Sequence, residues 1–206
     1  GFYWTEGIRG LGWAPDAVPT LKNGSTVGIP SPPAILMPDG SVVTPDVRDA
    51  ERLQGFDEDW TVAAASAARA SLRWSLIGNA VSVPVAKWLG DRLARPGTYD
   101  TDRDCPLADA ARWPRAARFD GDVRRAVAIN AHPQWVDRQP LHVFLKHEGK
   151  PLSARATRGF LSRTERSTLR FAPGFKEALR AHLARMEGRP ATDELDDPVD
   201  VEDRDD

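Results

Sequence analysis

Cysteine is nearly absent from this chain, and long apolar runs are missing altogether. One cysteine among 206 residues excludes an internal disulfide framework, so a reducing compartment, the cytoplasm, is the expected location. No apolar run approaches the roughly 18 residues of a membrane span. The N-terminus also has no charged-then-apolar targeting signal. We therefore expect a cytoplasmic protein with no membrane partner.

Charge is present in ordinary amounts but is unevenly distributed. The chain is 41% hydrophobic and 28% charged, which is typical of a soluble protein, and its net charge is −2. Residues 151–190 hold nine Lys and Arg against three acidic residues, whereas residues 191–206 hold nine acidic residues against one Arg. The first of these segments predicts basic helices, and the second predicts a disordered acidic tail over 189–206.

Residues 1–44 predict short strands and turns. Gly and Pro recur every few residues there, and no helical period survives them. The Pro38-Asp39-Gly40 turn lies between two apolar runs and predicts a β-hairpin.

Residues 45–55 predict a short helix. Thr44 can cap its N-terminus, Pro45 suits its first position because an N–H there would lack a partner anyway, and Gly55 can end it. The Ala-rich segment 62–72 predicts a second helix.

Residues 78–93 predict a turn followed by a helix. Gly78-Asn79 has turn chemistry, Ser82 can cap the helix, and Pro84 lies where a missing N–H costs least. The helix has an apolar face, formed by Val81, Val85, Trp88 and Leu89.

The C-terminal half gives mixed signals. Residues 94–120 predict a linker or loop, two short runs predict strands, and two longer segments predict helices. The strands are expected at 123–129 and 141–145, and the helices at 152–165 and 173–187. The last helix carries an apolar stripe that belongs in a core, formed by Phe175, Leu179, Leu183 and Met186.

Two blocks carry a resemblance to a known family. RDAERLQGF (48–56), followed some twenty residues later by GNAVSVPVA (78–86), resembles the last two motifs of the DNA (cytosine-5) methyltransferases. The upstream stretch RGLGWAPDAVPTLKNGS (9–25) resembles the end of that family's target-recognition region, where a Thr-Leu pair contacts DNA. The resemblance covers residues 1–93, and nothing in 94–206 contributes to it.

The resemblance implies a cofactor contact. In the family, the turn in the last motif touches the methionine end of S-adenosylmethionine, and the matching residues are Gly78, Asn79, Ala80 and Val81. Gly permits a close backbone approach, Asn supplies both a donor and an acceptor, and free N–H groups at a helix start suit a carboxylate. Spacing alone favours a plain helix-capping turn here, and the family match reverses that preference.

The reacting groups of the family are not found in this sequence. Its chemistry needs a cysteine that follows a proline and adds to a cytosine flipped out of the duplex. Cys105 precedes a proline instead and follows the last motif, so we interpret it as a loop cysteine and assign no catalytic residue. The Gly-rich cofactor loop, the Glu-Asn-Val segment and the arginine pair of the family are also missing. Residue 1 is Gly and the first methionine is Met37, so we expect a C-terminal fragment of a longer protein; a trimmed chain would look the same.

Double-stranded DNA is the partner that the resemblance implies. Thr20 and Lys22 are candidate phosphate contacts, because hydroxyl and basic side chains bind the backbone without reading sequence. For Arg48, Arg52 and Gln54, internal pairing is favoured over DNA contact. For the helices at 153–185, a solvated basic face is favoured over a DNA-backbone contact. The four histidines have no Cys or carboxylate at metal-ligand spacing, so no metal site is predicted.

The predicted fold class is α+β. We expect a small β-rich recognition module in residues 1–60, a helix in 61–95 that completes an absent doubly wound catalytic domain, and an unassigned α/β appendage in 96–188. The expected function is that of the C-terminal part of a DNA (cytosine-5) methyltransferase of the restriction-modification type, inactive by itself. Two alternatives remain: a non-enzymatic DNA- or partner-binding module, and one chain of a split methyltransferase whose catalytic half is a separate polypeptide.

Overall fold

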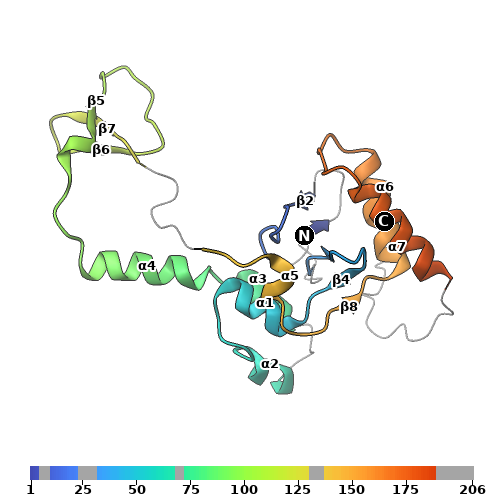
Figure 1. The fold of residues 1–206 in the computed structure, drawn as a ribbon. Coiled ribbons are helices and arrows are strands. Elements are labelled where there is room, and N and C mark those ends of the chain that lie inside the picture. The colour runs from blue at the N-terminus through green and yellow to red at the C-terminus, as the bar shows by residue number, and fades with distance from the viewer. Residues whose placement is uncertain (5–9, 23–31, 68–71, 130–136, 189–206) are drawn as a thin grey trace, which may run out of the picture. The chain divides into compact units, whose positions relative to one another are not determined.

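The computed structural model describes residues 1–4, 10–22, 32–67, 72–129 and 137–188 (Figure 1). Helices and short strands are mixed along these residues, in agreement with the α+β expectation. The chain forms two compact units. The first contains the described residues of 1–86 and 139–188, and the second contains the described residues of 87–138.

Two small antiparallel sheets lie in the first unit. Strands β1 (Phe2–Trp4) and β2 (Leu11–Trp13) form one of them. The other has the order β3-β4-β8, with β3 at Ile35–Leu36, β4 at Val42–Thr44 and β8 at Lys150–Pro151. The predicted hairpin at 38–40 is confirmed, since β3 and β4 are antiparallel and Gly40 has a left-handed φ of 78° in the turn between them.

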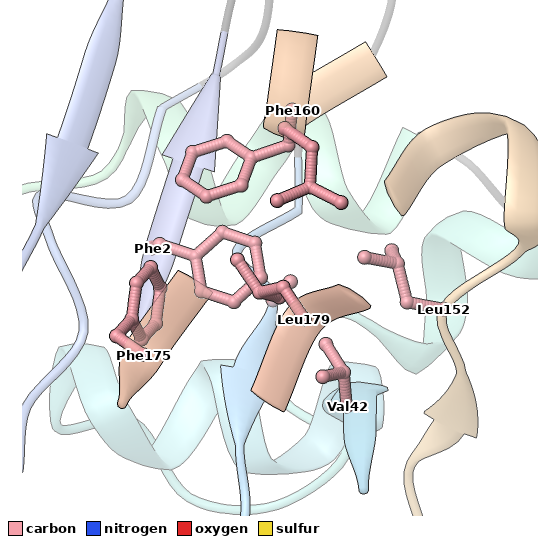
Figure 2. Close-up of a cluster of buried hydrophobic side chains, with 8 residues drawn as sticks. Phe2, Val42, Leu152, Phe160, Phe175 and Leu179 are labelled. Carbon is pink, nitrogen blue, oxygen red and sulfur yellow. The ribbon is translucent and has the colours of Figure 1, made fainter. Parts of the chain in front are cut away.

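Aromatic rings form the core of the first unit (Figure 2). The ring of Phe2 stacks on Phe160 with centroids 4.3 Å apart and meets Phe175 edge-on at 5.4 Å. Val42, Leu152 and Leu179 pack into the same cluster, and each is buried. Burying such side chains contributes about 1.5–3 kcal/mol each, so this cluster joins the N-terminal strands to the C-terminal helices.

The helices of that core are α6 (Ala154–Glu165) and α7 (Phe175–Glu187), close to the predicted ranges. Phe175 and Leu179 are buried and Leu183 packs against the cluster, so the core-facing stripe is confirmed for these three residues. The predicted strand at 141–145 is wrong, because Leu141–Phe144 forms the short helix α5. Long-range bonds hold this turn: the Asp16 carboxylate accepts the N–H of Leu141 at 2.6 Å.

Helix α1 covers Val47–Gln54. Gly55 ends it with a φ of 91°, as predicted, but Asp46 is the N-cap in place of Thr44. The Asp46 carboxylate accepts the N–H of Arg48 at 2.9 Å and also binds the Arg48 guanidinium. The Arg48 guanidinium lowers the pKa of Asp46 below its ordinary value, with further help from the same backbone N–H. Pro45 therefore lies before the helix.

The next helices differ from prediction at the point that matters for the cofactor. Helix α2 covers Val62–Ala67, α3 covers Leu72–Asn79, and α4 covers Val83–Ala94. Gly78 and Asn79 thus form the last turn of α3, where a free turn was predicted. The bend between α3 and α4 is at residues 80–82. The helix continues because the run from Leu72 to Ile77 has no breaker, and one Gly costs a helix only about 1 kcal/mol.

The second unit contains strands that the sequence did not predict. After a 3-10 turn at Thr101–Arg103, strand β5 (Asp104–Pro106) and strand β6 (Ala117–Phe119) flank β7 (Arg124–Val127) in a three-stranded antiparallel sheet. The strand predicted at 123–129 is β7. The segment 94–120 forms strands because ion pairs cross the sheet: Arg118 binds the Asp104 carboxylate at 2.6 Å.

The structure groups the chain differently from the boundaries predicted at residues 60, 95 and 188. Residues 96–188 do not form one appendage, because 139–187 pack with the N-terminal strands while 96–138 belong to the second unit. The predicted acidic tail at 189–206 lies outside the described residues. No helix in the described parts of the chain is long and apolar enough to cross a bilayer.

Candidate functional sites

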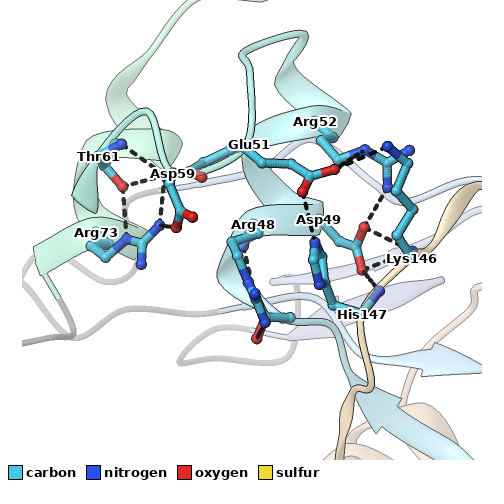
Figure 3. A network of polar contacts seen from close by, with 11 residues as sticks. Arg48, Asp49, Glu51, Arg52, Asp59, Thr61, Arg73, Lys146 and His147 are labelled. Atoms are coloured by element: carbon cyan, nitrogen blue, oxygen red, sulfur yellow. Dashed lines mark hydrogen bonds and ion pairs between the residues drawn. The ribbon is translucent and has the colours of Figure 1, made fainter.

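Helix α1 holds its neighbours through two opposite faces (Figure 3). Asp49 and Arg52 lie one turn apart on one face, and Glu51 and Gln54 lie one turn apart on another, about 200° around the axis. Asp49 and Glu51 are both completely buried. A buried carboxylate needs several hydrogen-bond donors. The donors to Asp49 and to Glu51 therefore show which segments α1 holds in place.

The Asp49 face binds the segment after α5. The Asp49 carboxylate accepts the backbone N–H groups of Lys146 and His147, both at 3.0 Å, and pairs with Arg52. Arg52 in turn donates to the carbonyl oxygen of Phe144 at 2.7 Å. The preference for internal pairing of Arg52 is confirmed. It links the first motif to residues more than 90 positions later.

Glu58 extends this face with exposed charges. Its carboxylate binds Lys146 Nζ at 3.0 Å and His147 Nε2 at 3.2 Å. The hydrogen bond from Lys146 is the main cause that lowers the pKa of Glu58 below its ordinary value, and His147 acts in the same direction.

The Glu51 face binds α3 at its start. Glu51 Oε1 accepts the Thr61 N–H at 2.9 Å and the Arg73 guanidinium at 3.1 Å, and it also accepts the Thr61 hydroxyl. Arg73 makes a further ion pair with Asp59 at 3.1 Å. The first turn of α3 is therefore held to α1 by a buried ion pair.

Gln54 binds α3 at its other end. Its side-chain nitrogen donates to the carbonyl oxygens of Ile77 at 3.0 Å and Ala80 at 3.2 Å. Two carbonyl acceptors fix the orientation of the amide, because only its NH2 group can donate to both. Internal pairing is confirmed for Gln54, and also for Arg48, which pairs with Asp46.

The four predicted cofactor residues lie together at the α3–α4 bend. Asn79 is exposed, and its side chain makes no hydrogen bond to any other residue that the structure describes. Val81 is also exposed, and Gly78 and Ala80 are half-buried. Among the described residues, nothing accepts the backbone N–H groups of Val81 and Ser82, which lie just before α4.

These donors fit the carboxylate end of an amino-acid-like ligand. A helix start with free N–H groups attracts an anion, and the Asn79 amide adds a donor and an acceptor beside it. The Ala80 carbonyl is already bound by Gln54. The assignment of Gly78, Asn79, Ala80 and Val81 to the cofactor stays a prediction.

Thr20 and Lys22 are both exposed and follow the β1–β2 hairpin. Lys22 Nζ donates to the Tyr3 hydroxyl oxygen at 2.7 Å and lies 4.5 Å from the centre of the Tyr3 ring. The Tyr3 ring covers Gly12, and a Cβ at Gly12 would meet it at 2.0 Å. The hairpin thus presents a cation and a hydroxyl next to each other, a combination that suits a phosphate. Residues 9 and 23–25 of the recognition-like stretch lie outside the described residues.

Cys105 is an exposed cysteine on β5 of the second unit.

The acidic residues of the basic helices α6 and α7 form ion pairs within these helices: Arg158 pairs with Glu187, and Arg180 pairs with Glu165 and Glu177. Among His, Cys, Asp and Glu of the described residues, no group of three could hold a metal ion.

Motif matching made the α3–α4 bend and the Lys22 segment candidates and gave no role to Glu51, Asp49 or Tyr3. A buried acidic residue has no sequence signal apart from its place among apolar helix positions. Asp49 and Glu51 are the sequence neighbours of Ala50, which is buried, and this position is the sequence feature that could have indicated their burial.

Comparison with known proteins shows that the chain is similar in sequence to part of a methyltransferase. The chain is 47% identical over 172 residues to the Type II methyltransferase M2.BsuMI of Bacillus subtilis (strain 168). The match covers 82% of this chain and 44% of that protein, so the chain spans less than half the length of its relative. The methyltransferase resemblance carried by the motifs is thereby confirmed.

The match is longer than residues 1–93, so part of 94–206 is shared with M2.BsuMI as well. No family model matches the chain. No solved structure matches it either.

Proposed function

We propose that this chain is the C-terminal part of a DNA (cytosine-5) methyltransferase that transfers a methyl group from S-adenosylmethionine to carbon 5 of cytosine in duplex DNA. The observation that supports the proposal is the bend at residues 80–82, where the Asn79 amide and the N–H groups of Val81 and Ser82 have no partner among the described residues and match the family's cofactor turn in sequence. The similarity to a Type II methyltransferase supports the reaction class, and the motifs support cytosine as the base.

In this proposal the bend binds one end of the cofactor. S-adenosylmethionine supplies the methyl group when it is bound. Asn79 holds the carboxylate end together with the N–H groups of Val81 and Ser82. Helix α1 fixes the position of the bend. No residue of this chain is assigned to the attack on the base, so the catalytic cysteine is provided by a preceding segment or by a separate chain.

The hairpin side of the unit binds the DNA backbone. Lys22 and Tyr3 contact one phosphate, and Thr20 contacts the strand nearby. These contacts position the duplex without reading its sequence. Restriction-modification is the setting that the relative's description as a Type II enzyme supports.

Helix α4 supports the requirement for a further catalytic part. Its apolar side chains are exposed, with exposed fractions of 63% for Val85, 50% for Leu89 and 75% for Leu93. A stripe of this kind is typical of a surface that another domain covers. In the family, the corresponding helix completes the catalytic domain.

The test is incorporation of tritiated methyl groups into unmethylated genomic DNA. This chain alone should show none. Adding the N-terminal half, covalently or as a separate polypeptide, should restore transfer to cytosine. Restoration by a separate polypeptide would support the split-enzyme form of the proposal.

Cys105 provides the control. Incorporation by the isolated chain that survives Cys105→Ser would show that the chemistry is not that of the family. Incorporation that is lost with Cys105→Ser would show that Cys105 is the nucleophile. If the N-terminal half restores no transfer and the protein still binds DNA, the non-enzymatic binding module becomes the better explanation.

A further inference from the structure

Helix α1, which carries the first motif, binds both ends of α3. The second of these ends lies at the α3–α4 bend, where the cofactor is proposed to bind. Glu51 and Gln54 lie one turn apart on the same face of α1. Glu51 accepts a hydrogen bond from Arg73 in the first turn of α3. Gln54 donates to the carbonyl of Ile77, in the last turn of α3, and to the carbonyl of Ala80, just beyond it. One face of α1 therefore binds both ends of α3.

Gly55 brings the start of α4 against the same place. A Cβ at Gly55 would lie 2.5 Å from Cδ of Pro84 and 3.3 Å from Cβ of Val83, so only a glycine lets the end of α1 approach α4 this closely. Its φ of 91° also disfavours other residues. The bend at 80–82 is thus bounded by Gln54 on the side of α3 and by Gly55 on the side of α4.

We propose that Gln54 is a positioning residue for the cofactor: it does not touch S-adenosylmethionine, but it fixes the bend that presents Asn79 and the N–H groups of Val81 and Ser82. This rests on the proposed function. The Ala80 carbonyl lies between these donors in the chain, so its bond to Gln54 sets the direction in which the neighbouring peptide groups point. Without that bond, the bend samples other conformations, and only a fraction of molecules present the donors together.

The proposal separates Gln54 from a residue that only stabilises the fold. The core of this unit is the aromatic cluster around Phe2, of which Gln54 is not a member. The ion pair between Arg73 and Glu51 at the start of α3 does not involve Gln54, so it should remain when Gln54 is changed. Loss of Gln54 should therefore weaken cofactor binding more than it weakens folding or DNA binding.

The experiment uses the complete methyltransferase, with this chain joined to its N-terminal half. Gln54→Glu keeps the shape of the side chain but replaces the donor by an oxygen that faces two carbonyls. Gln54→Lys keeps a donor. Gln139→Glu is the matched control, because Gln139 is exposed and makes no hydrogen bond to a described residue. The dissociation constant for S-adenosylmethionine is measured by calorimetry, and DNA affinity and melting temperature are measured on the same samples.

Gln54→Glu should raise the dissociation constant for S-adenosylmethionine about tenfold, which is the effect of losing two ordinary hydrogen bonds. The constant for Gln54→Lys should lie between that of Gln54→Glu and the wild type. DNA affinity should stay within about twofold, and Gln139→Glu should match the wild type throughout.

Unchanged cofactor affinity in Gln54→Glu, measured against a wild type that binds, would overturn the positioning role and leave the proposed function intact. Equal weakening for cofactor and DNA together with a lower melting temperature would also overturn it, because Gln54 would then be purely structural. A wild-type complete protein that binds DNA but no S-adenosylmethionine would refute the proposed function and this inference with it.

Discussion

Glu51 accepts three hydrogen bonds on one carboxylate oxygen while completely buried. The other oxygen, Oε2, has no hydrogen-bond partner among the described residues. The buried Glu51 carboxylate is stabilised by the positive charge of Arg73, whose Nη2 lies 3.1 Å from Glu51 Oε1. Breaking a buried pair by removing one charge costs more than the pair contributes, since the remaining charge stays buried.

Glu51→Gln should therefore lower the free energy of unfolding by about 3 kcal/mol, because Arg73 loses its buried counter-charge. Urea denaturation measures the change. The control is Glu148→Gln, since Glu148 is exposed and makes no ion pair within the described residues. A loss no larger than that of the control would mean that Asp59 alone neutralises Arg73.

Lys22 is the residue on which the DNA assignment can be tested most directly. Lys22→Ala should weaken binding similarly on all DNA sequences and reduce the slope of log affinity against log salt by about one unit, since one phosphate contact is lost. Lys150→Ala is the control, because Lys150 is exposed on β8. A variant that changes which site is methylated, at an unchanged salt slope, would show that Lys22 reads bases.

Asn79 offers the corresponding test for the cofactor. Asn79→Ala in the complete protein should reduce the affinity for S-adenosylmethionine by on the order of tenfold to a hundredfold, or about 1–3 kcal/mol, since a polar group of the ligand loses its partner. Calorimetric titration measures it, with Ser75→Ala one turn earlier on α3 as the control. Wild-type affinity in Asn79→Ala would reject the contact.

At the scale of elements, the sequence was sufficient to predict the turns and helices that depend on neighbouring residues. The Gly40 hairpin, the Gly55 stop and helices α6 and α7 could all be predicted from neighbouring residues, because turn chemistry and helical period are short-range properties. The N-cap was predicted at Thr44, but it is Asp46. Both have the right chemistry, and Arg48, which binds the Asp46 side chain, decides between them.

Elements whose conformation depends on residues far away in the chain were not predicted correctly from the sequence. Helix α5 has the composition of a strand, and its N-terminus is bound by Asp16, 125 positions earlier. The candidate cofactor residues were located by motif, yet the free turn predicted at Gly78-Asn79 is the last turn of α3. Both ends of α3 are bound from α1, since Gln54 donates to the Ile77 carbonyl and Glu51 accepts from Arg73. The resemblance supplied the position of the bend, and the structure supplied what holds it.

The contact between α1 and the segment after α5 should depend on pH through Glu58. The folded-state pKa of Glu58 is lowered from its ordinary value of 4.5, mainly by Lys146, so its contribution to stability is present above that value. The contribution is lost as the pH falls through the lowered folded-state pKa.

Glu58→Gln tests this by urea denaturation over a range of pH. The stability difference between wild type and variant should be constant near neutrality and should shrink below about pH 4.5. Asp57→Asn, a change at the exposed neighbouring residue, should show no such trend. A difference that grows on acidification would contradict the pairing.

At the scale of the whole molecule, residues 139–187 complete the core that residues 1–44 begin. Phe160, Phe175 and Leu179 surround Phe2, and β8 pairs with β4. The hairpin with Lys22 and the α3–α4 bend therefore belong to one compact unit, although the chain leaves that unit between residues 87 and 138. The proposed DNA-contacting segment and the proposed cofactor bend therefore belong to the same unit, and α1 binds the bend.

The exposed face of α4 provides the last prediction, which concerns how the proposed catalytic half attaches. Val85 and Leu89 are one turn apart on that face and largely exposed, so the isolated chain should associate with itself as its concentration rises. Leu89→Glu should reduce this association, as measured by sedimentation. It should also lower the methyl transfer restored by the N-terminal half by more than tenfold, because burying a leucine contributes about 1.5–3 kcal/mol and burying an unpaired charge is unfavourable. Lys87→Glu on the polar side of the helix should leave both properties unchanged. Full restoration of transfer by Leu89→Glu would show that the catalytic half binds elsewhere.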